Sequence, residues 1–513
     1  MPVHGAVEPI DGLGPLIPGA KNCMVRRIGV VLTAMLLVVA GSCSEPERAP
    51  AVPGTFSVAL SEPARLLPAE VTDLPGRLVA DAVWTPLFAA RTDAPAVRPL
   101  AALSATSTDL ITWTVRLRPG MRFHDGSPVT AQSYVDTWRT VLLRQWRGAE
   151  VLTKTLRAKD FRAADPLTVE LVLERPLGQV PLMLCAVVLV PLPPSALSAG
   201  NWTEFAKHPV GNGPYRMVEP WRPGSGARLA RVEDYQGPAK GIAREITLRV
   251  AANPDEQYEL ARSGQVDLAT EVPGGRHHQM HSDFGDRVLM WPLPEVTMLG
   301  IPLRDKRFTD AAARHALALA VDRAALEAGP LRHQVDVATS VLPPAVVLGR
   351  RSAKCRPCNF DPTAAKALWE QANSPATELS LTFPAGADAW AQALAKQLGA
   401  TLNLTVSPKV GESQDGLSVL TRTPHTRSPH ELLASLTALG YANAAFDQAM
   451  TAADTADLTT SGDAYRRAEN QVLRDLPVLP LWSGHGHAVW GQRLSEVTPS
   501  PSLAIDLATI KVA

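Results

Sequence analysis

Residues 116–138, RLRPGMRFHDGSPVTAQSYVDTW, place a histidine, an aspartate and several hydroxyl side chains close together. Hydrolysis by a Ser–His–Asp arrangement needs a nucleophile, a base and an orienting carboxylate within hydrogen-bond reach of one another. His124 and Asp125 are adjacent, and neighbouring side chains in a tight turn point apart. The chain contains no Gly-x-Ser-x-Gly, His-Glu-x-x-His or Ser-x-x-Lys motif. We therefore expect no catalytic residues, no cofactor and no enzyme activity.

Two groups of histidines could bind a metal ion, because imidazole is a common zinc ligand. His277, His278 and His281 are close in sequence, with the first and last one helical turn apart, and His485 and His487 follow a predicted strand. No carboxylate or cysteine completes either set locally, and surface histidines are common. The sequence alone predicts no metal site.

Cys355 and Cys358 have the Cys-x-x-Cys spacing of a redox motif or of half a zinc site. No second pair of matching spacing occurs, and the motif lies in a loop rich in proline and arginine. In an oxidising compartment such a pair forms a small structural disulfide, which is the interpretation we favour.

The elements that carry residues 116–138 can be read from local patterns. Alternating apolar residues predict a strand over 113–117, and Pro119-Gly120 predicts a type II turn. Met121–His124 then returns as the partner strand, and Asp125-Gly126 forms a second turn. Thr130 is a good N-cap for a helix that begins at Ala131. Every polar residue here has a local structural role.

The N-terminal region predicts export. Met24 starts a basic segment that is followed by an apolar stretch and by small residues before Cys43. This layout resembles the lipobox of bacterial lipoproteins, in which the cysteine is acylated, although Ala40 stands where leucine is usual. We expect residues 1–42 to be a signal peptide, with Met24 as the alternative start, and 43–54 a lipid-anchored linker. The protein would then lie on the outer face of the bacterial cytoplasmic membrane.

The composition gives little reason to expect a charged polymer as partner. The 513 residues include 50 Lys and Arg against 50 Asp and Glu, so no net charge steers the protein toward nucleic acid. Short alternating strands such as 245–250 and helical stretches such as Phe308–Leu326 indicate a mixed α/β protein.

The segment 117–131 resembles a stretch of the family-5 extracellular solute-binding proteins, the peptide- and nickel-binding components of ABC importers. Ser133 departs from that family's usual Asp. Further similar segments follow in the family's order: PVGNGPYRMVEPW (209–221), EDYQG (233–237), ARSGQVDLA (261–269), FTDAAARHALALAVDRAAL (308–326), FDPTAAKALWEQA (360–372) and YRRAENQVLRDLPVLPLW (465–482). The resemblance covers the chain from about Thr55 to its end.

The resemblance implies a two-lobed periplasmic-binding fold with an extra domain inserted in the first lobe and the ligand held between the lobes. We expect the following division: lobe one over 55–85, 206–285 and 481–513, the inserted domain over 86–205, and lobe two over 286–480.

Members that bind dipeptides or oligopeptides hold the ligand's α-amine with an Asp on a lobe-two strand, just before an Asp-Pro or Glu-Pro pair. Here Ser428-Pro429 takes the place of that pair, and His425 stands where the Asp would be. The region 383–390, where an Arg for the ligand's carboxylate should lie, contains none. The strand 417–423 should present its backbone to the ligand. The residues that we expect near the ligand are Glu62, Arg422, Thr423, His425, Tyr441 and Asn443.

These features predict a monomeric, lipid-anchored receptor that passes peptides, oligopeptides rather than free dipeptides, to an ABC permease and its ATPase. Without the two end-binding charges, recognition should rest on backbone bonds and apolar contact. This favours longer or end-blocked peptides, or another extended small solute, over free dipeptides. Three alternatives stay open: an exported enzyme, a non-transport envelope protein on the same scaffold, and an importer component for a metal or metal complex.

Overall fold

The computed structural model describes residues 53–91, 94–347, 355–372, 376–413 and 415–513. The expected signal peptide and Cys43 lie outside the described residues. Among the described helices, none is long and apolar enough to cross a membrane.

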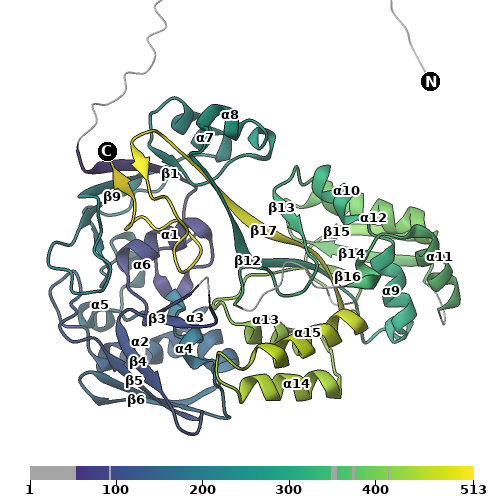
Figure 1. The fold of residues 1–513 in the computed structure, drawn as a ribbon, viewed down its shortest axis with the longest axis horizontal. Helices are drawn as coiled ribbons and strands as arrows, with labels where there is room; N and C mark the ends of the chain where they lie inside the picture. The colour runs from purple at the N-terminus through teal and green to yellow at the C-terminus, as the bar shows by residue number, and fades with distance from the viewer. Residues whose placement is uncertain (1–52, 92–93, 348–354, 373–375, 414) are drawn as a thin grey trace, which may run out of the picture. The chain divides into compact units, whose positions relative to one another are not determined.

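An eleven-stranded sheet runs through the molecule, and its two longest strands are central (Figure 1). β12 (Val288–Gly300) and β17 (Val478–Trp490) are antiparallel partners of 13 residues each. Their register shifts between Pro292 and Val296, where two prolines interrupt β12. This break divides the sheet into two parts.

On one side of the break lies the first lobe, and on the other the second. The first-lobe strands are β1 (Thr55–Leu60), β8 (Tyr215–Met217), β9 (Gly226–Arg231), β10 (Glu245–Val250) and β11 (Leu268–Ala269). The second-lobe strands are β13 (Val335–Val337), β14 (Glu378–Phe383), β15 (Thr405–Val410) and β16 (Leu417–Arg422). The strand expected over 245–250 is therefore confirmed as β10.

Helices cover both parts of the sheet. Those of the first lobe are α1 (Leu74–Val83), α7 (Pro254–Arg262) and α8 (Met280–Phe284). Those of the second are α9 (Ala311–Leu319), α10 (Arg323–Ala328), α11 (Pro362–Gln371), α12 (Asp388–Leu402), α13 (Pro429–Ala438), α14 (Ala444–Asp454) and α15 (Gly462–Asp475). Two core clusters of the second lobe are built wholly from residues between Val296 and Trp482.

A separate four-stranded sheet lies within residues 86–205. Its strands are β4 (Ala102–Thr106), β5 (Thr112–Leu117), β7 (Thr168–Leu173) and β6 (Ala158–Asp165), in that order. The helical elements of this segment are α2 (Ala131–Arg144), α3 (Gly148–Glu150), η2 (Val151–Thr155), α4 (Val180–Met183), α5 (Pro194–Ala199) and α6 (Trp202–Lys207). One apolar cluster joins this segment to the first lobe, so the insertion shares the first lobe's core.

The C-terminal segment returns to the beginning of β1 and to the residue that precedes β11. Arg493 donates to Asp267 at 2.9 Å and to the carbonyl of Thr55 at 3.1 Å. Asp267 also accepts from the backbone and hydroxyl of Ser57. The ion pair is largely buried, so it joins the first strand, the middle segment and the C-terminal tail.

The segment 116–138 folds mainly as its local patterns predict. β5 is the expected strand, and Thr130 caps α2 in a reciprocal capping box with Ser133. The departure at Ser133 therefore still provides a helix start. The expectation that Met121–His124 pairs with this strand is wrong, because β4 and β7 occupy both edges of β5. Residues 121–129 instead form a small loop of their own, closed by three backbone hydrogen bonds.

His124 and Asp125 point apart, as expected of a turn. The imidazole of His124 contacts the Gly213 carbonyl at 3.1 Å and accepts from the Gly211 N–H at 3.2 Å. Asp125 accepts from Ser127 and from Ser195. Since neither hydroxyl contacts the imidazole, these residues form no nucleophile–base pair.

The helical stretch expected over 308–326 is split into α9 and α10. Asp322 caps α10 by accepting from the Ala325 N–H at 3.0 Å, which ends the first helix before Arg323. The side chain of Arg323 is buried and donates to the carbonyls of Ala338, Pro480 and Cys358. The interruption thus turns one arginine inward, and burial lowers its pKa to about 10.

Cys355 and Cys358 form a disulfide with their Cα atoms 5.2 Å apart. Cys355 caps the short helical turn η6 (Arg356–Cys358), Cys358 is its last residue, and both are buried against the second-lobe core. The bond closes a loop too short to restrict much of the unfolded chain, so it contributes little stability through chain entropy.

We predict that His124 makes the protein less stable in acid. Burial is the main reason that its pKa falls to about 4, whereas an unfolded histidine titrates near about 6.5. Between these values the unfolded chain binds the extra proton, so stability is lost as the pH falls from about 6.5 toward 4. His124→Gln should remove up to about 3 kcal/mol of this dependence. Urea unfolding at several pH values measures how the stability depends on pH. His281→Gln is the control and should behave as the wild type does. Parallel stability profiles for His124→Gln and wild type would show that His124 does not cause the loss of stability in acid.

We also predict that Arg323→Met destabilises the protein by about 3 kcal/mol, because three buried carbonyls lose their charged donor. The exposed Arg467→Met is the matched control and should change stability by less than about 0.5 kcal/mol. Urea unfolding followed by tryptophan fluorescence compares the two. Equal effects would show that the buried contacts of Arg323 are not important for the second lobe.

Candidate ligand-binding cleft

A cleft of about 810 Å³ lies where the first lobe, the inserted domain and the second lobe meet. The first lobe contributes Val71, Thr72 and Arg77, and the inserted domain contributes residues between Arg147 and Arg157. The second lobe contributes 421–425 and α13. The volume lies within the range of about 300–1,000 Å³ that is typical of small-molecule sites.

The second-lobe wall is fixed by one partly buried carboxylate. Glu431, in the first turn of α13, accepts from the backbone and ring of His425 at 2.8 and 3.0 Å. It also accepts from the backbone and hydroxyl of Thr426 at 2.9 and 2.8 Å. Burial raises the pKa of Glu431, but these hydrogen bonds outweigh it and hold the pKa below its ordinary value.

This contact orients His425 toward the ligand space. Nδ1 donates to Glu431, so a neutral ring presents Nε2 as an acceptor. His425 lines the cleft, and no protein partner of Nε2 exists among the described residues. The imidazole can therefore accept an N–H from a ligand.

The cleft contains an excess of positive charge. Arg77, Arg147, Lys154, Arg157 and Arg422 line it, against the carboxylates of Glu150 and Glu431. Glu150 is paired with Lys154 at 2.8 Å, and Glu431 accepts hydrogen bonds from the loop that begins at His425. Within the described residues, no carboxylate lies within 4 Å of the four guanidinium groups. Burial lowers the pKa of Arg77 and of Arg157, which shows that both charges are partly removed from water.

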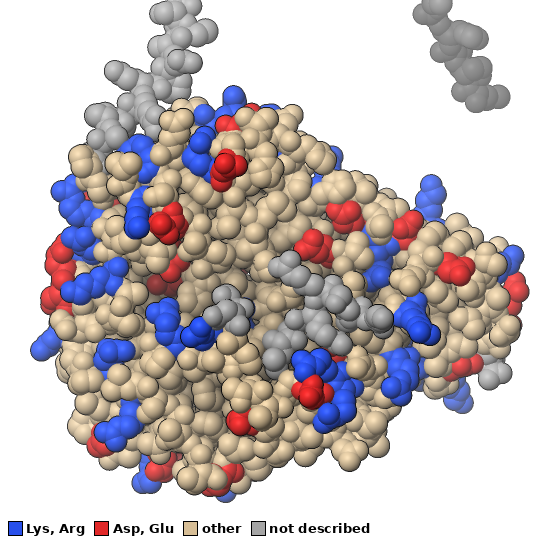
Figure 2. Space-filling model, in the orientation of Figure 1, with Lys and Arg blue, Asp and Glu red and all other residues tan. Residues whose placement is uncertain are grey.

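This excess is local. On the face drawn in Figure 2, Lys and Arg are interspersed with Asp and Glu, and neither sign covers a broad continuous area. An anionic group would therefore find its strongest protein partners inside the cleft rather than on this surface.

The edge of β16 offers backbone groups as well. β12 pairs with β16 along 418–422, whereas β14 pairs only with Leu417 and Ser418. From Val419 onward the edge away from β12 has no neighbouring strand within the part of the chain that the structure describes. An extended ligand can pair with such an edge.

The structure brings three of the six predicted ligand residues together: Arg422, Thr423 and His425 all line the cleft. Glu62 does not line it; its carboxylate accepts from the Trp221 indole and the Gly224 N–H, both at 2.7 Å. Tyr441 and Asn443 also lie elsewhere, and both donate to Asp475 within the second lobe.

Sequence reasoning missed Arg77, Arg147, Arg157 and Glu431. The three arginines carry no local signal, because they come from segments that meet only in the folded chain. Glu431 did carry a local sequence signal, because Ser428 and Glu431 have the Ser-x-x-Glu spacing of a capping box. Ser428 does cap α13, but Glu431 reaches beyond it to residues 425 and 426.

None of His277, His485 and His487 lines this cleft. The described cleft therefore contains three features that can bind a ligand: cations, a free strand edge and one imidazole acceptor.

Several solved structures of known proteins share this fold. The E. coli murein tripeptide binding protein MppA matches with a TM-score of 0.71 and 18% identity, over 89% of this chain and 98% of that one. HbpA2 from Haemophilus parasuis matches with a TM-score of 0.77 and 17% identity, over 90% and 100%. Helicobacter pylori DppA, solved with the peptide STSA, matches with a TM-score of 0.72 and 18% identity, over 89% and 98%. The two-lobed periplasmic-binding fold expected from the sequence is thus confirmed.

Sequence comparison gives relatives and a family. The glutathione-binding protein GsiB of Escherichia coli K12 is 24% identical over 356 residues, which are 68% of this chain. GsiB of Shigella dysenteriae is equally similar. The chain spans 66% of the length of these relatives. The model for the bacterial extracellular solute-binding proteins, family 5, matches residues 96–455, more than half of the chain. The protein therefore belongs to the family-5 bacterial extracellular solute-binding proteins.

Proposed function

We propose that this protein is a lipid-anchored receptor outside the cytoplasmic membrane that binds a peptide in the cleft and delivers it to an ABC permease and its ATPase. The family supports the class, and the cleft supports the ligand. The observation that carries the ligand class is the set of guanidinium groups without carboxylate partners, next to a free strand edge.

The ligand chemistry follows from these groups. The sequence suggested recognition by backbone bonds and apolar contact alone, but Arg77, Arg157 and Arg422 add positive charge from three different segments. Guanidinium groups bind carboxylates through charge-assisted, often bidentate, hydrogen bonds. We infer an extended peptide with a free carboxylate, longer than a dipeptide, whose main chain pairs with β16 beyond Val419. His425 Nε2 would accept one of its N–H groups.

The relatives' names agree with such a ligand. GsiB is described as glutathione-binding, and MppA as binding a murein tripeptide. Both are peptides longer than a dipeptide. The alternatives of an enzyme, an envelope protein without transport and a metal importer have no comparable support in the cleft. A neighbouring gene pair for a permease and an ATPase would separate a transport role from the enzyme and the envelope protein without transport, whereas the ligand itself separates a peptide importer from a metal importer.

Peptides of three to five residues with a free C-terminus should raise the melting temperature in step with their concentration. C-terminal amidation should weaken binding at least about tenfold, since a charge-assisted hydrogen bond contributes about 1.5–3 kcal/mol. A thermal-shift screen that includes glutathione and free dipeptides, followed by calorimetry on the hits, measures both effects.

The double variant Arg157→Met/Arg422→Met should lose this preference for the free carboxylate. Arg144→Met is the matched control, because Arg144 is exposed on α2 but does not line the cleft. Equal binding of amidated and free peptides by the wild type would contradict the carboxylate proposal. Strong binding of free dipeptides, unaffected by His425→Ala, would contradict the proposed length preference.

Anchoring is tested separately. If Cys43 is acylated, the full-length protein should enter the detergent phase after Triton X-114 partitioning, and Cys43→Ser should move it to the aqueous phase or leave the signal uncut. The distribution is followed by immunoblotting and intact mass. The same partitioning for both proteins would mean that no lipid is attached at Cys43.

A further inference from the structure

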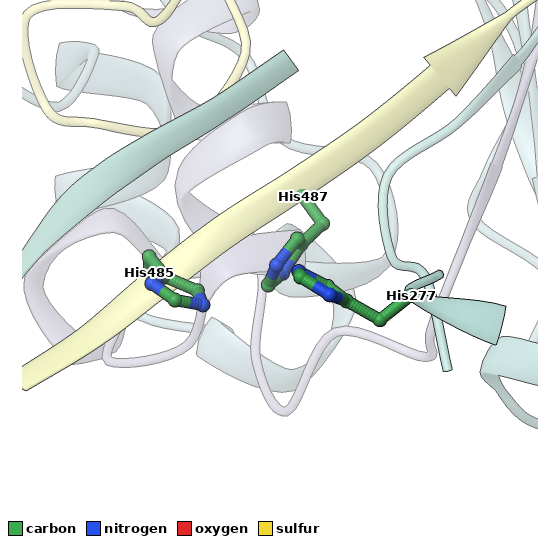
Figure 3. A group of neighbouring side chains, drawn as sticks. All are labelled: His277, His485 and His487. Carbon is green, nitrogen blue, oxygen red and sulfur yellow. The ribbon is translucent and has the colours of Figure 1, made fainter. Parts of the chain in front are cut away.

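A cluster of histidines surrounds the second half of β17, away from the cleft (Figure 3). His485 and His487 are two residues apart on this strand, so their side chains leave the same face. His277 follows the short turn η4 (Gly274–Arg276) of the first lobe and points toward them. Sequence spacing had suggested partners for His277 within its own segment, but the fold brings it to β17 instead.

The three rings are close enough to share one ion. One nitrogen from each of His277, His485 and His487 lies within 4.8 Å of the others. A tetrahedral zinc site has metal–nitrogen bonds of about 2.0–2.1 Å, which sets its nitrogens about 3.3 Å apart. The longest separation therefore needs to shorten by about 1.5 Å, a change that side-chain rotation can provide.

Two of the three rings carry a nitrogen without a partner. Nε2 of His487 and Nε2 of His277 are buried and make no hydrogen bond with any of the described residues. His487 is only 5% exposed, and the side chain of His485 is 8% exposed. A buried polar atom without a partner is costly, so native structures rarely keep one unless it has another role. A bound metal ion would give both nitrogens a partner.

Two second-lobe groups, a carboxylate and a backbone carbonyl, contact the ring nitrogens of His485. Nδ1 of His485 lies 3.5 Å from a carboxylate oxygen of Asp336, and its Nε2 lies 3.3 Å from the carbonyl of His333. One ring nitrogen can therefore bind a metal while the other keeps a hydrogen-bond partner, the usual arrangement of a ligating histidine. His333 packs beside His277 and pairs with Glu327 at 2.6 Å.

The backbone beside this cluster has two unusual features, namely positive φ angles and a close approach at a glycine. Arg332 and His333 both have positive φ, 50° and 59°, which side chains other than glycine rarely adopt. Gly486 separates the two strand histidines, and a Cβ there would lie 2.3 Å from the ring of Trp291. Strained positions of this kind persist where the surrounding structure fixes them, and they are frequent at binding sites.

We propose that His277, His485 and His487 form a binding site for one divalent transition-metal ion, of which Zn²⁺ is the example we test. An all-imidazole set suits Zn²⁺, Ni²⁺ or Cu²⁺, whereas Ca²⁺ and Mg²⁺ prefer oxygen ligands. Water would complete the coordination, because three histidines leave one tetrahedral position open. The ion would join a first-lobe loop to the strand that crosses between the lobes.

Binding of ZnCl₂ to metal-free protein without an affinity tag tests the proposal. We expect one high-affinity Zn²⁺ per chain by calorimetry, and His277→Ala should weaken it at least tenfold. His277 is chosen because it lies in a partly exposed loop, so its loss should leave the fold intact; circular dichroism of the metal-free proteins checks this. His281→Ala is the matched control, since it changes the same segment outside the trio and should bind as the wild type does.

A second readout reports the ligands directly. Co²⁺ in place of Zn²⁺ should give the visible absorption of a tetrahedral site in the wild type and in His281→Ala, and lose it in His277→Ala and His485→Gln. The cleft variant Arg157→Met/Arg422→Met should keep full metal binding, which separates this site from the peptide cleft. No stoichiometric Zn²⁺, or equal Zn²⁺ affinity in His277→Ala and wild type, would overturn the proposal. Loss of metal binding in the cleft variant alone would overturn it too.

Discussion

The pairing of β12 with β17 is the interaction on which the rest of the structure depends. These two strands are the connection through which the sheet passes from one lobe to the other. Their hydrogen bonds stop between Pro292 and Val296, because proline has no N–H to donate and the register shifts there. The pair is therefore continuous enough to carry both lobes and locally interrupted where they meet. A break of this kind is a natural position for hinge motion between lobes.

Both sites described above are placed relative to this strand pair. The second-lobe wall of the cleft begins where β16, the neighbour of β12, ends at Arg422. The histidine cluster lies on the other half of β17, at the positions that pair with Met290 and Pro292. A change in the angle between the lobes would move the walls of the cleft, and it would also move His277 relative to the residues behind β17. The two sites can thus be sensitive to the same motion while their ligands remain separate.

The charges of the cleft also follow a common physical rule. Cations that are partly removed from water lose hydration, and they are usually compensated by carboxylates close by. Here the available carboxylates are already committed, Glu150 to Lys154 and Glu431 to the loop at 425–426. Arg77 and Arg157 interact with other carboxylates only at longer range. Since neither makes a close ion pair among the described residues, their hydrogen-bond donors remain for an anionic ligand. Binding energy is thereby concentrated where segments of both lobes face one another.

The sequence by itself determined the elements whose signals are local. The alternation of β5, the Thr130 cap of α2 and the ordered motifs from 117 to 482 were sufficient for the α/β class and the family. It also placed Arg422, Thr423 and His425, which are neighbours on one strand end. Only the tertiary structure decided which distant residues meet: Arg77 and Arg157 in the cleft, His277 beside β17, and the partners of Glu62 and Tyr441 outside it. The physical reason is that a contact across 80 or 200 residues is set by sheet order and lobe packing, and a single chain carries no local pattern that records it.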